Sequence, residues 1–176
     1  TINWDKLKEL INLSVRFLDN VIDMNEYPLE AIKKMSHGNR KIGLGIMGWA
    51  DMLILLGISY NSEKAFKLGE RVMEFINYHA HLSSIELAKD RGPFPNYEMS
   101  TFKDSETLKT MYSRPDSQLD WDFVREQIGK YGQRNGTCTT VAPTGTIAVI
   151  ANASQGVEPL FAIAYERHTP TFTLYE

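Results

Sequence analysis

A short β-branched segment leads into a proline, a polar turn and an apolar run within the stretch Thr137–Ile150. The β-branched half is typical of a strand. Pro143 ends this strand, because proline has a fixed φ and no N–H to donate to a strand ladder. Thr144, Gly145 and Thr146 follow as a tight turn in which the glycine is free to take a positive φ.

The apolar run that comes next, Ile147–Ala151, is compatible with a helix or with a second strand. If it is a helix, the free N–H groups of its first turn point into the polar turn, beside two threonine hydroxyls, and can hold an anion such as a phosphate. The helix dipole adds roughly 0.3–1 kcal/mol to such binding. An ordinary strand–turn–helix with a capping threonine explains the same residues, so the pattern alone leaves both readings open.

Another strand is predicted at Arg40–Met47, where aliphatic residues alternate with glycines. The aliphatic side chains fall on one face of this strand, and Gly43 and Gly45 fall on the other. A bare glycine face costs stability and usually means that another backbone or a ligand lies close against it.

Gly43–Gly48 also spells the dinucleotide-binding pattern G-x-G-x-x-G. That pattern requires a helix opening at the third glycine and an acidic residue about 20 positions later, at the end of a second strand. Here the glycines lie within the predicted strand, and the region around Leu68–Glu70 reads as helix. A nicotinamide-dependent oxidoreductase is therefore disfavoured, and it would need a helix directly after Gly48.

Apolar residues repeat at three- and four-residue spacing along much of the remaining chain, which predicts helices. Asn3 or Asp5, Ser62 and Asp120 are suited to cap three of them. The predicted helices are Asn3–Asp23, Pro28–Met35, Trp49–Leu56, a long helix between Ser62 and Asp90, a short one at Ser105–Tyr112, and Trp121–Lys130.

The segments between the helices are predicted to be less regular. His37–Asn39 reads as a turn, and Ala151–Gly156 reads as a loop of small residues. Pro93–Gln118 is polar and contains three prolines. We interpret it as a long ordered loop on the surface rather than as a segment that contacts a partner. Leu160–Tyr165 is a further predicted strand.

Few single residues point to chemistry on their own. Glu158 is a lone loop carboxylate, which is more often solvated or a structural acceptor than catalytic. His79 and His81 lie two apart on a helix and point to different faces, which argues against a shared metal. Cys138 is the only cysteine. A single cysteine excludes an internal disulfide and multi-cysteine metal sites, and it fits a reducing compartment. The residue itself is best interpreted as a small buried hydrophobic side chain.

Composition further narrows the classes of protein to which the chain can belong. With 43% hydrophobic and 23% charged residues, the 176-residue chain can build one domain with a sizeable core. A net charge of -3 gives no basic surface for nucleic acid. No apolar run reaches roughly 18 residues, so no membrane span is expected. The polar start argues against a signal peptide. A cytoplasmic location is expected, and the abrupt start suits a piece of a longer protein.

Several motifs occur together in a recognisable order. The chain reads Arg134-Asn135-Gly136-Thr137, then Thr139-Thr140-Val141-Ala142-Pro143-Thr144-Gly145-Thr146-Ile147, then Gly156-Val157-Glu158-Pro159-Leu160-Phe161-Ala162. Together with Arg40–Gly48 and Gly92–Tyr97, these segments resemble the large subunit of ribonucleotide reductases, and most closely its vitamin B12-dependent class. The likeness covers nearly all of the chain.

The resemblance implies a fold and a substrate site. Residues 1–176 would form a single partial domain, the later part of a ten-stranded α/β barrel, as a helix-rich fragment with about four strands. The strand at Arg40–Met47 would line the barrel, and its glycines would leave room for a threaded loop. The substrate phosphates would lie on the turn of Pro143, Thr144, Gly145, Thr146 and Ile147, held by three backbone N–H groups and two hydroxyls.

The resemblance also implies the chemistry of a whole reductase, which replaces the ribose 2′-hydroxyl by hydrogen through a radical. It implies adenosylcobalamin as cofactor, in preference to a radical from a separate di-iron subunit. The implied partners are a ribonucleoside di- or triphosphate, the remainder of the reductase barrel, a thioredoxin-type reductant and a possible second copy. The family's radical and redox cysteines cannot be placed in this chain, so the isolated chain is expected to be inactive.

Two other functions stay open at this point. The chain could be a non-catalytic phosphate- or nucleotide-binding module, which calorimetry with nucleotides would detect. It could also be an assembly segment that pairs with a missing partner, and an exposed strand edge would be its mark.

Overall fold

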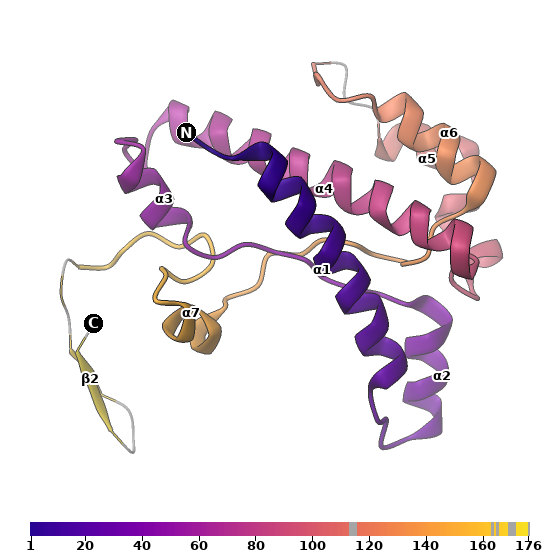
Figure 1. Ribbon diagram of the computed structural model, residues 1–176, viewed down its shortest axis with the longest axis horizontal. Helices are drawn as coiled ribbons and strands as arrows, with labels where there is room; N and C mark the ends of the chain where they lie inside the picture. The colour runs from indigo at the N-terminus through magenta and orange to yellow at the C-terminus, as the bar shows by residue number, and fades with distance from the viewer. Residues whose placement is uncertain (113–115, 163, 165, 169–171, 176) are drawn as a thin grey trace. The chain divides into compact units, whose positions relative to one another are not determined.

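The computed structural model describes residues 1–112, 116–162, 164, 166–168 and 172–175 (Figure 1). Two strands, β1 (Glu166–His168) and β2 (Thr173–Tyr175), pair antiparallel with His168 opposite Thr173. The elements are α1 (Trp4–Met24), α2 (Glu30–Asn39), α3 (Trp49–Leu55), α4 (Glu63–Arg91), the 3-10 helices η1 (Tyr97–Met99) and η2 (Thr101–Lys103), α5 (Ser105–Met111), α6 (Trp121–Tyr131), α7 (Gly145–Ala151), β1 (Glu166–His168) and β2 (Thr173–Tyr175).

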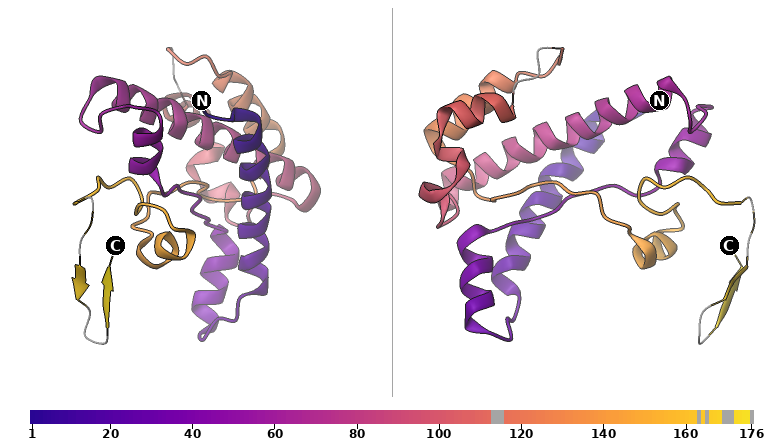
Figure 2. Two further views of the ribbon diagram at one scale, coloured as in Figure 1. Left: turned by 60° about the vertical axis from the view of Figure 1, so that its left-hand side comes forward. Right: turned by 180° about the vertical axis from the view of Figure 1, so that it is seen from behind.

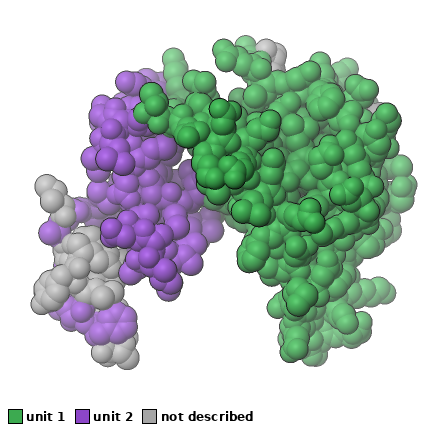
Figure 3. Space-filling view, in the orientation of Figure 1, with its two compact units in different colours: residues 1–45, 67–141 green, residues 46–66, 142–176 purple. Residues whose placement is uncertain are grey.

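The chain groups into two compact units, coloured separately in Figure 3. Unit 1 comprises Thr1–Gly45 and Lys67–Val141, and unit 2 comprises Ile46–Phe66 and Ala142–Glu176. The single domain expected over residues 1–176 stays a prediction. Within the described ranges, no helix combines the length and the apolar character needed to cross a bilayer.

The predicted partial α/β barrel with about four strands is wrong for this structure. The described residues hold one two-stranded antiparallel sheet and an isolated parallel bridge between Leu44 and Thr139. Leu44 N donates to Cys138 O at 2.9 Å, and Thr140 N donates to Leu44 O at 3.0 Å. Both predicted strands are therefore extended and adjacent. They do not build a sheet, because the long segment that joins them in sequence is mostly helical and supplies no further strand among its described residues.

The glycine face predicted at Arg40–Met47 does meet another backbone. A Cβ on Gly45 would lie 2.7 Å from the carbonyl oxygen of Thr140, and a Cβ on Gly43 would lie 2.8 Å from the Thr140 methyl group. Glycine is required at Gly45 because a real Cβ does not approach a backbone atom so closely, whereas a Cβ at Gly43 would require the Thr140 side chain to shift. The close neighbour is a segment of this same chain.

The strand predicted at Leu160–Tyr165 is also wrong where it can be compared. Residues 160–162 have no strand structure, residues 163 and 165 lie outside the described residues, and β1 begins only at Glu166.

Capping residues set the starts of three helices as predicted. Asn3 Oδ1 accepts from Lys6 N at 3.0 Å, and Ser62 Oγ accepts from Ala65 N at 3.2 Å. Asp120 Oδ1 accepts from Phe123 N at 2.9 Å. These bonds satisfy N–H groups that the first turn of a helix leaves free.

The turn predicted at His37–Asn39 is instead the last turn of α2. The helix ends at Asn39, and the next residue, Arg40, adopts a left-handed conformation with φ 44°.

The segment predicted as a surface loop, Pro93–Gln118, contributes to the core of unit 1. The short helix predicted in this segment is confirmed as α5. Four aromatic residues of the segment, however, are buried against α4 and α6. Trp121 stacks on Tyr112 with ring centroids 5.5 Å apart and meets Tyr78 edge-on at 5.4 Å. Figures 1 and 2 show α5 and α6 beside the later half of α4. The four buried aromatic residues are Phe94, Tyr97, Phe102 and Tyr112.

A buried carboxylate joins the ends of several elements in unit 1. Asp19 of α1 is fully buried and lies 2.8 Å from Nη2 of Arg40, which follows α2. Its other oxygen lies 3.1 Å from Arg91, the last residue of α4, and 3.3 Å from Nε of Arg134. Asn135 Nδ2 donates to Asp19 Oδ1 at 3.0 Å. One side chain therefore ties α1, α2, α4 and the segment before Thr137 together.

A second buried polar cluster lies inside the same unit. Burial lowers the pKa of His81 to about 4. Tyr112 OH lies 3.2 Å from His81 Nε2, and Gln133 Nε2 lies 2.6 Å from His81 Nδ1. Gln133 also donates to the sulfur of Cys138 at 3.1 Å. Burial raises the pKa of this thiol to about 11, so it stays protonated.

His79 lies on another face of α4 and meets the ring of Phe75 at 4.3 Å. The predicted divergence of His79 and His81 is confirmed.

We predict that Asp19→Asn lowers the free energy of unfolding by about 3–5 kcal/mol, because the arginines around it lose their buried counter-charge. Asp23→Asn is the matched control. Asp23 also binds Arg40, at 2.7 Å, but its side chain is 45% exposed, so we expect a loss of at most about 1 kcal/mol. Urea unfolding measures both changes, and equal effects would contradict the central role of Asp19.

We also predict an acid-sensitive core. The folded pKa of His81, about 4, lies below its usual value of 6.5, so the unfolded chain binds the proton more tightly. The neutral His81 side chain makes its full contribution to the free energy of unfolding above pH 6.5. This contribution, about 3 kcal/mol, is lost as pH falls toward 4. Urea unfolding as a function of pH should show this slope. His81→Asn should remove most of the slope, while His79→Gln should remove a smaller part, because burial also lowers the pKa of the less buried His79.

Candidate functional site

The turn after Pro143 leads directly into α7, so the apolar run is a helix rather than a second strand. The residue in the left-handed region is Thr144, with φ 52° and ψ 26°, and not Gly145 as the sequence had suggested. For a β-branched residue this conformation is strained and costs of order 1–3 kcal/mol. The surrounding contacts must therefore hold Thr144 in place.

Two hydrogen bonds hold Thr144 in this conformation. Its hydroxyl oxygen accepts from Gly156 N at 2.6 Å, and its carbonyl oxygen accepts from Ala148 N at 2.9 Å. Each bond contributes about 0.5–1.5 kcal/mol. The two bonds thus offset much of the strain and fasten the start of α7 to the loop that follows it.

The first N–H groups of α7 have no partner in the part of the chain that the structure describes. Among the described residues, no acceptor is recorded for the backbone N–H of Gly145, Thr146 or Ile147, and the first closed bond of the helix is that of Ala148. Thr144 Oγ1 uses a lone pair to accept from Gly156, so its own proton remains available to donate. The turn therefore presents three N–H donors and two threonine hydroxyls.

The turn is open rather than packed shut. A Cβ on Gly145 would meet no protein atom within 4 Å, and Pro143, Thr146 and Ile147 are exposed. Gly145 has a helical φ, so neither backbone conformation nor a close protein neighbour requires glycine there. All five residues predicted for the site lie on this one turn, with space beside its glycine.

The loop after α7 is fastened to the start of α3 within unit 2. Asp51 Oδ2 accepts from Ser154 N at 2.6 Å, and Ser154 Oγ accepts from Asp51 N at 3.3 Å. Gly48 N donates to Ser154 O at 2.8 Å, and Trp49 N donates to Gly156 O at 3.4 Å. Sequence reasoning assigned no role to Asp51 or Ser154, because nothing in their spacing of 103 residues shows that they meet.

These contacts bear on the dinucleotide-binding alternative. A helix does begin directly after Gly48, as that alternative requires. However, the N–H groups of Trp49 and Asp51 at its start bind the loop of unit 2. The region where the second strand and its acidic residue should stand is the long helix α4. The G-x-G-x-x-G pattern does not form a dinucleotide site in the described residues.

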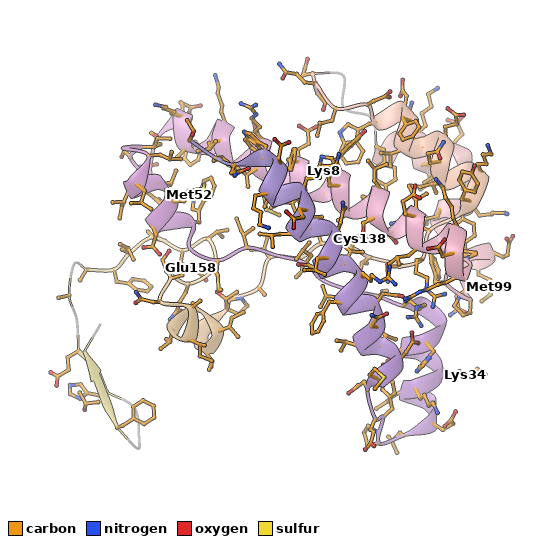
Figure 4. All side chains as sticks on the ribbon, viewed as in Figure 1. Lys8, Lys34, Met52, Met99, Cys138 and Glu158 are labelled. Atoms are coloured by element: carbon orange, nitrogen blue, oxygen red, sulfur yellow. The ribbon has the colours of Figure 1, made fainter. Side chains whose placement is uncertain are left out.

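Glu158 lies on the loop that follows α7, where Figure 4 labels it. Its Oε2 atom is buried and has no hydrogen-bond partner among the described residues. A Cβ on Gly156 would lie 2.5 Å from this oxygen. The sequence favoured a solvated or hydrogen-bonded carboxylate over a direct substrate role, and Oε2 is neither solvated nor hydrogen-bonded among the described residues.

No metal centre accompanies the turn. Across the residues that the structure describes, no group of three or more His, Cys, Asp and Glu side chains could hold a metal ion. The only thiol, Cys138, is buried and protonated, which supports its prediction as a small buried hydrophobe. The arrangement can bind an anion, but the described residues supply no redox group.

Comparison with known proteins shows which family this chain resembles. Residues 1–174 match the family described as "Ribonucleotide reductase, barrel domain". A vitamin B12-dependent ribonucleoside-diphosphate reductase of Thermoplasma acidophilum is 46% identical over 167 residues, covering 95% of this chain and 19% of that protein. The protein of the same name from Mycobacterium tuberculosis is 40% identical over 166 residues, covering 94% of this chain and 20% of its own length.

A third relative belongs to another named group. The ribonucleoside-diphosphate reductase subunit alpha of Chlamydia pneumoniae is 38% identical over 173 residues, covering 91% of this chain and 17% of that protein. The chain thus spans about a fifth of the length of the relatives it matches. The match over nearly its whole length shows that this chain belongs to the ribonucleotide reductase family.

Proposed function

We propose that this chain is part of a ribonucleotide reductase, which converts ribonucleotides to deoxyribonucleotides, and that Pro143–Ile147 holds the phosphates of the substrate. The observation that carries the site is the set of three unoccupied N–H groups on an open turn. Family membership supplies the reaction, and the relatives named ribonucleoside-diphosphate reductases favour a ribonucleoside diphosphate as substrate.

The proposed binding uses hydrogen bonds without a cationic side chain. The N–H groups of Gly145, Thr146 and Ile147 would donate to phosphate oxygens, and the hydroxyls of Thr144 and Thr146 would add two donors. Residues 142–162 contain no lysine or arginine. Hydrogen bonds to a charged acceptor contribute about 1.5–3 kcal/mol each, so such a turn can bind a phosphate without a basic neighbour.

The remaining chemistry is proposed for the whole enzyme. Two of the relatives are named vitamin B12-dependent, so we propose adenosylcobalamin as the radical source of the full reductase. The donor set of the described residues does not suit a redox centre, since the one thiol is buried with a pKa of about 11. We therefore assign the cofactor no residue in this chain. A thioredoxin-type reductant and a second copy stay predictions.

A non-catalytic nucleotide-binding module is the alternative, and one observation favours it. The contacts that hold the turn, from Gly156 N and Ala148 N, all lie within unit 2. Calorimetry with nucleoside diphosphates on the 176-residue chain would separate the two. Binding as tight as that of the whole reductase would favour the module, and much weaker binding would favour one part of a composite site.

We predict that Gly145→Val raises the Kd of the full reductase for a ribonucleoside diphosphate at least about tenfold, or 1.4 kcal/mol. The space beside Gly145 holds no protein atom, so the added methyl groups would meet the ligand and not the fold. Gly145→Ala should have a smaller effect in the same direction. Isothermal titration calorimetry measures both.

The matched control is Gly129→Ala in α6. A Cβ there also meets no atom within 4 Å, and alanine in a helix should stabilise the chain by about 0.5–1 kcal/mol. Its Kd should equal that of the unchanged protein. An unchanged Kd for Gly145→Val would remove the phosphate role of the turn.

We predict different effects for the two threonines of the turn. Thr144→Val leaves Gly156 N without its acceptor and should lower the free energy of unfolding by about 1–3 kcal/mol. Thr146 is exposed, and no partner for its hydroxyl is recorded among the described residues. Thr146→Val should therefore change stability by less than about 0.5 kcal/mol and still weaken ribonucleotide binding. Stability loss in both variants, with binding unchanged in the second, would contradict the assigned roles.

A further inference from the structure

Helix α1 carries a broad apolar surface, and only part of it is covered within the described residues. Ile11, Val15 and Ile22 are buried. Contacts between Trp4 and Phe75 and between Asn12 and Ser83 show that α1 packs along α4 in the same direction. The uncovered part is an exposed stripe at three- and four-residue spacing, formed by Leu10, Leu13, Phe17, Val21 and Met24.

Helical geometry makes the buried residues and the stripe two parts of one broad apolar arc. Successive residues are about 100° apart around the axis, so the five stripe residues fall within about 80° of one another. The buried residues are centred about 140° from the stripe, and the half-buried Leu7 and Leu18 lie between the two groups on one side. On the other side lies a polar strip of Lys8, Asn12, Arg16 and Asp23. A helix with so wide an apolar arc is normally buried over the whole arc.

The stripe lies on the outside of unit 1. In Figure 1, α1 lies in front of α4, and no segment is drawn between it and the viewer. Phe17 and Leu13 are 64% and 65% exposed. Contiguous apolar patches of this kind on a soluble protein mark a surface that another polypeptide covers.

We propose that the stripe on α1 is covered by an apolar face of the same reductase polypeptide, from the part that lies outside residues 1–176. This rests on the proposed function, in which the chain is one part of a longer enzyme. The length of the relatives supports that occupant, since about four-fifths of each lies beyond the match to this chain. The stripe itself contains no charged residue, so the covering face is apolar and needs no ionic partner.

Two methionines allow a test without substitution. Met24 in the stripe and Met99 in η1 are equally exposed, at 82% each. Hydrogen peroxide should oxidise both at similar rates in the 176-residue chain. In the longer reductase polypeptide, the rate for Met24 should fall at least about fivefold from its value in the 176-residue chain. Peptide mass spectrometry measures the rates, and an unchanged rate for Met24 would overturn the proposal.

A neighbouring pair of substitutions gives a second measurement. Phe17→Cys places a thiol on the stripe and Arg16→Cys places one on the polar strip, while the native Cys138 is buried. In the 176-residue chain both introduced thiols should react with a maleimide at similar rates. In the longer polypeptide the thiol at position 17 should react at least about tenfold more slowly than the thiol at position 16. Equal rates there would overturn the proposal.

A second copy of the chain is the competing occupant. It predicts that the thiol at position 17 is already protected in the 176-residue chain, increasingly so at higher protein concentration, and that result would also overturn the proposal. Ribonucleotide affinity of the longer polypeptide is measured in parallel. Loss of phosphate binding would refute the proposed function without changing the labelling ratio, so the two failures are distinguishable.

Discussion

The carboxylate of Asp19 is the contact on which the arrangement of unit 1 depends. It is fully buried, and it meets Arg40, Arg91 and Arg134 from three different parts of the chain. A buried ion of this kind is stabilising only while its partners remain in place. The cluster therefore fixes α1, the end of α4 and the segment before Thr137 against one another. That last segment runs toward Pro143, where the candidate phosphate turn begins.

The candidate turn depends on a second, smaller set of contacts within unit 2. Thr144 is held in a strained conformation by Gly156 N and Ala148 N, and the loop that carries Gly156 is fastened to the start of α3 by Asp51 and Ser154. These bonds occupy the N–H groups of Trp49 and Asp51 at the start of α3, whereas no acceptor among the described residues binds the first three N–H groups of α7. The difference explains why the threonine turn, and not the G-x-G-x-x-G pattern, is the anion-binding candidate.

Much of the helical structure could be predicted from sequence, because it depends on local signals. The caps at Asn3, Ser62 and Asp120 form as expected. At the candidate site, the helix after the polar turn was one of two structures that the sequence allowed, and the phosphate-binding role of Pro143–Ile147 stays a prediction. The sheet could not be predicted, since pairing depends on neighbours far away in the chain. Two extended segments lie side by side and form a single bridge between Leu44 and Thr139, with no other strand recorded beside them in the described ranges.

Other errors have the same origin in tertiary contacts. The segment Pro93–Gln118 was predicted to lie on the surface because it is polar on average, yet its spaced aromatic residues are buried in the core. The positive φ was expected at Gly145 because glycine adopts it most easily. It falls on Thr144 because the hydroxyl of that residue binds Gly156, which is distant in sequence and close in space.

The most direct test of the central claim is a titration of the full reductase with a ribonucleoside diphosphate, followed by amide NMR of a sample labelled in this segment. The account predicts that the amide signals of Gly145, Thr146 and Ile147 shift together and saturate at one Kd, while those of Trp49 and Asp51 stay in place. If the three α7 signals remain unchanged at saturating nucleotide, the turn does not hold the phosphates and the account is contradicted.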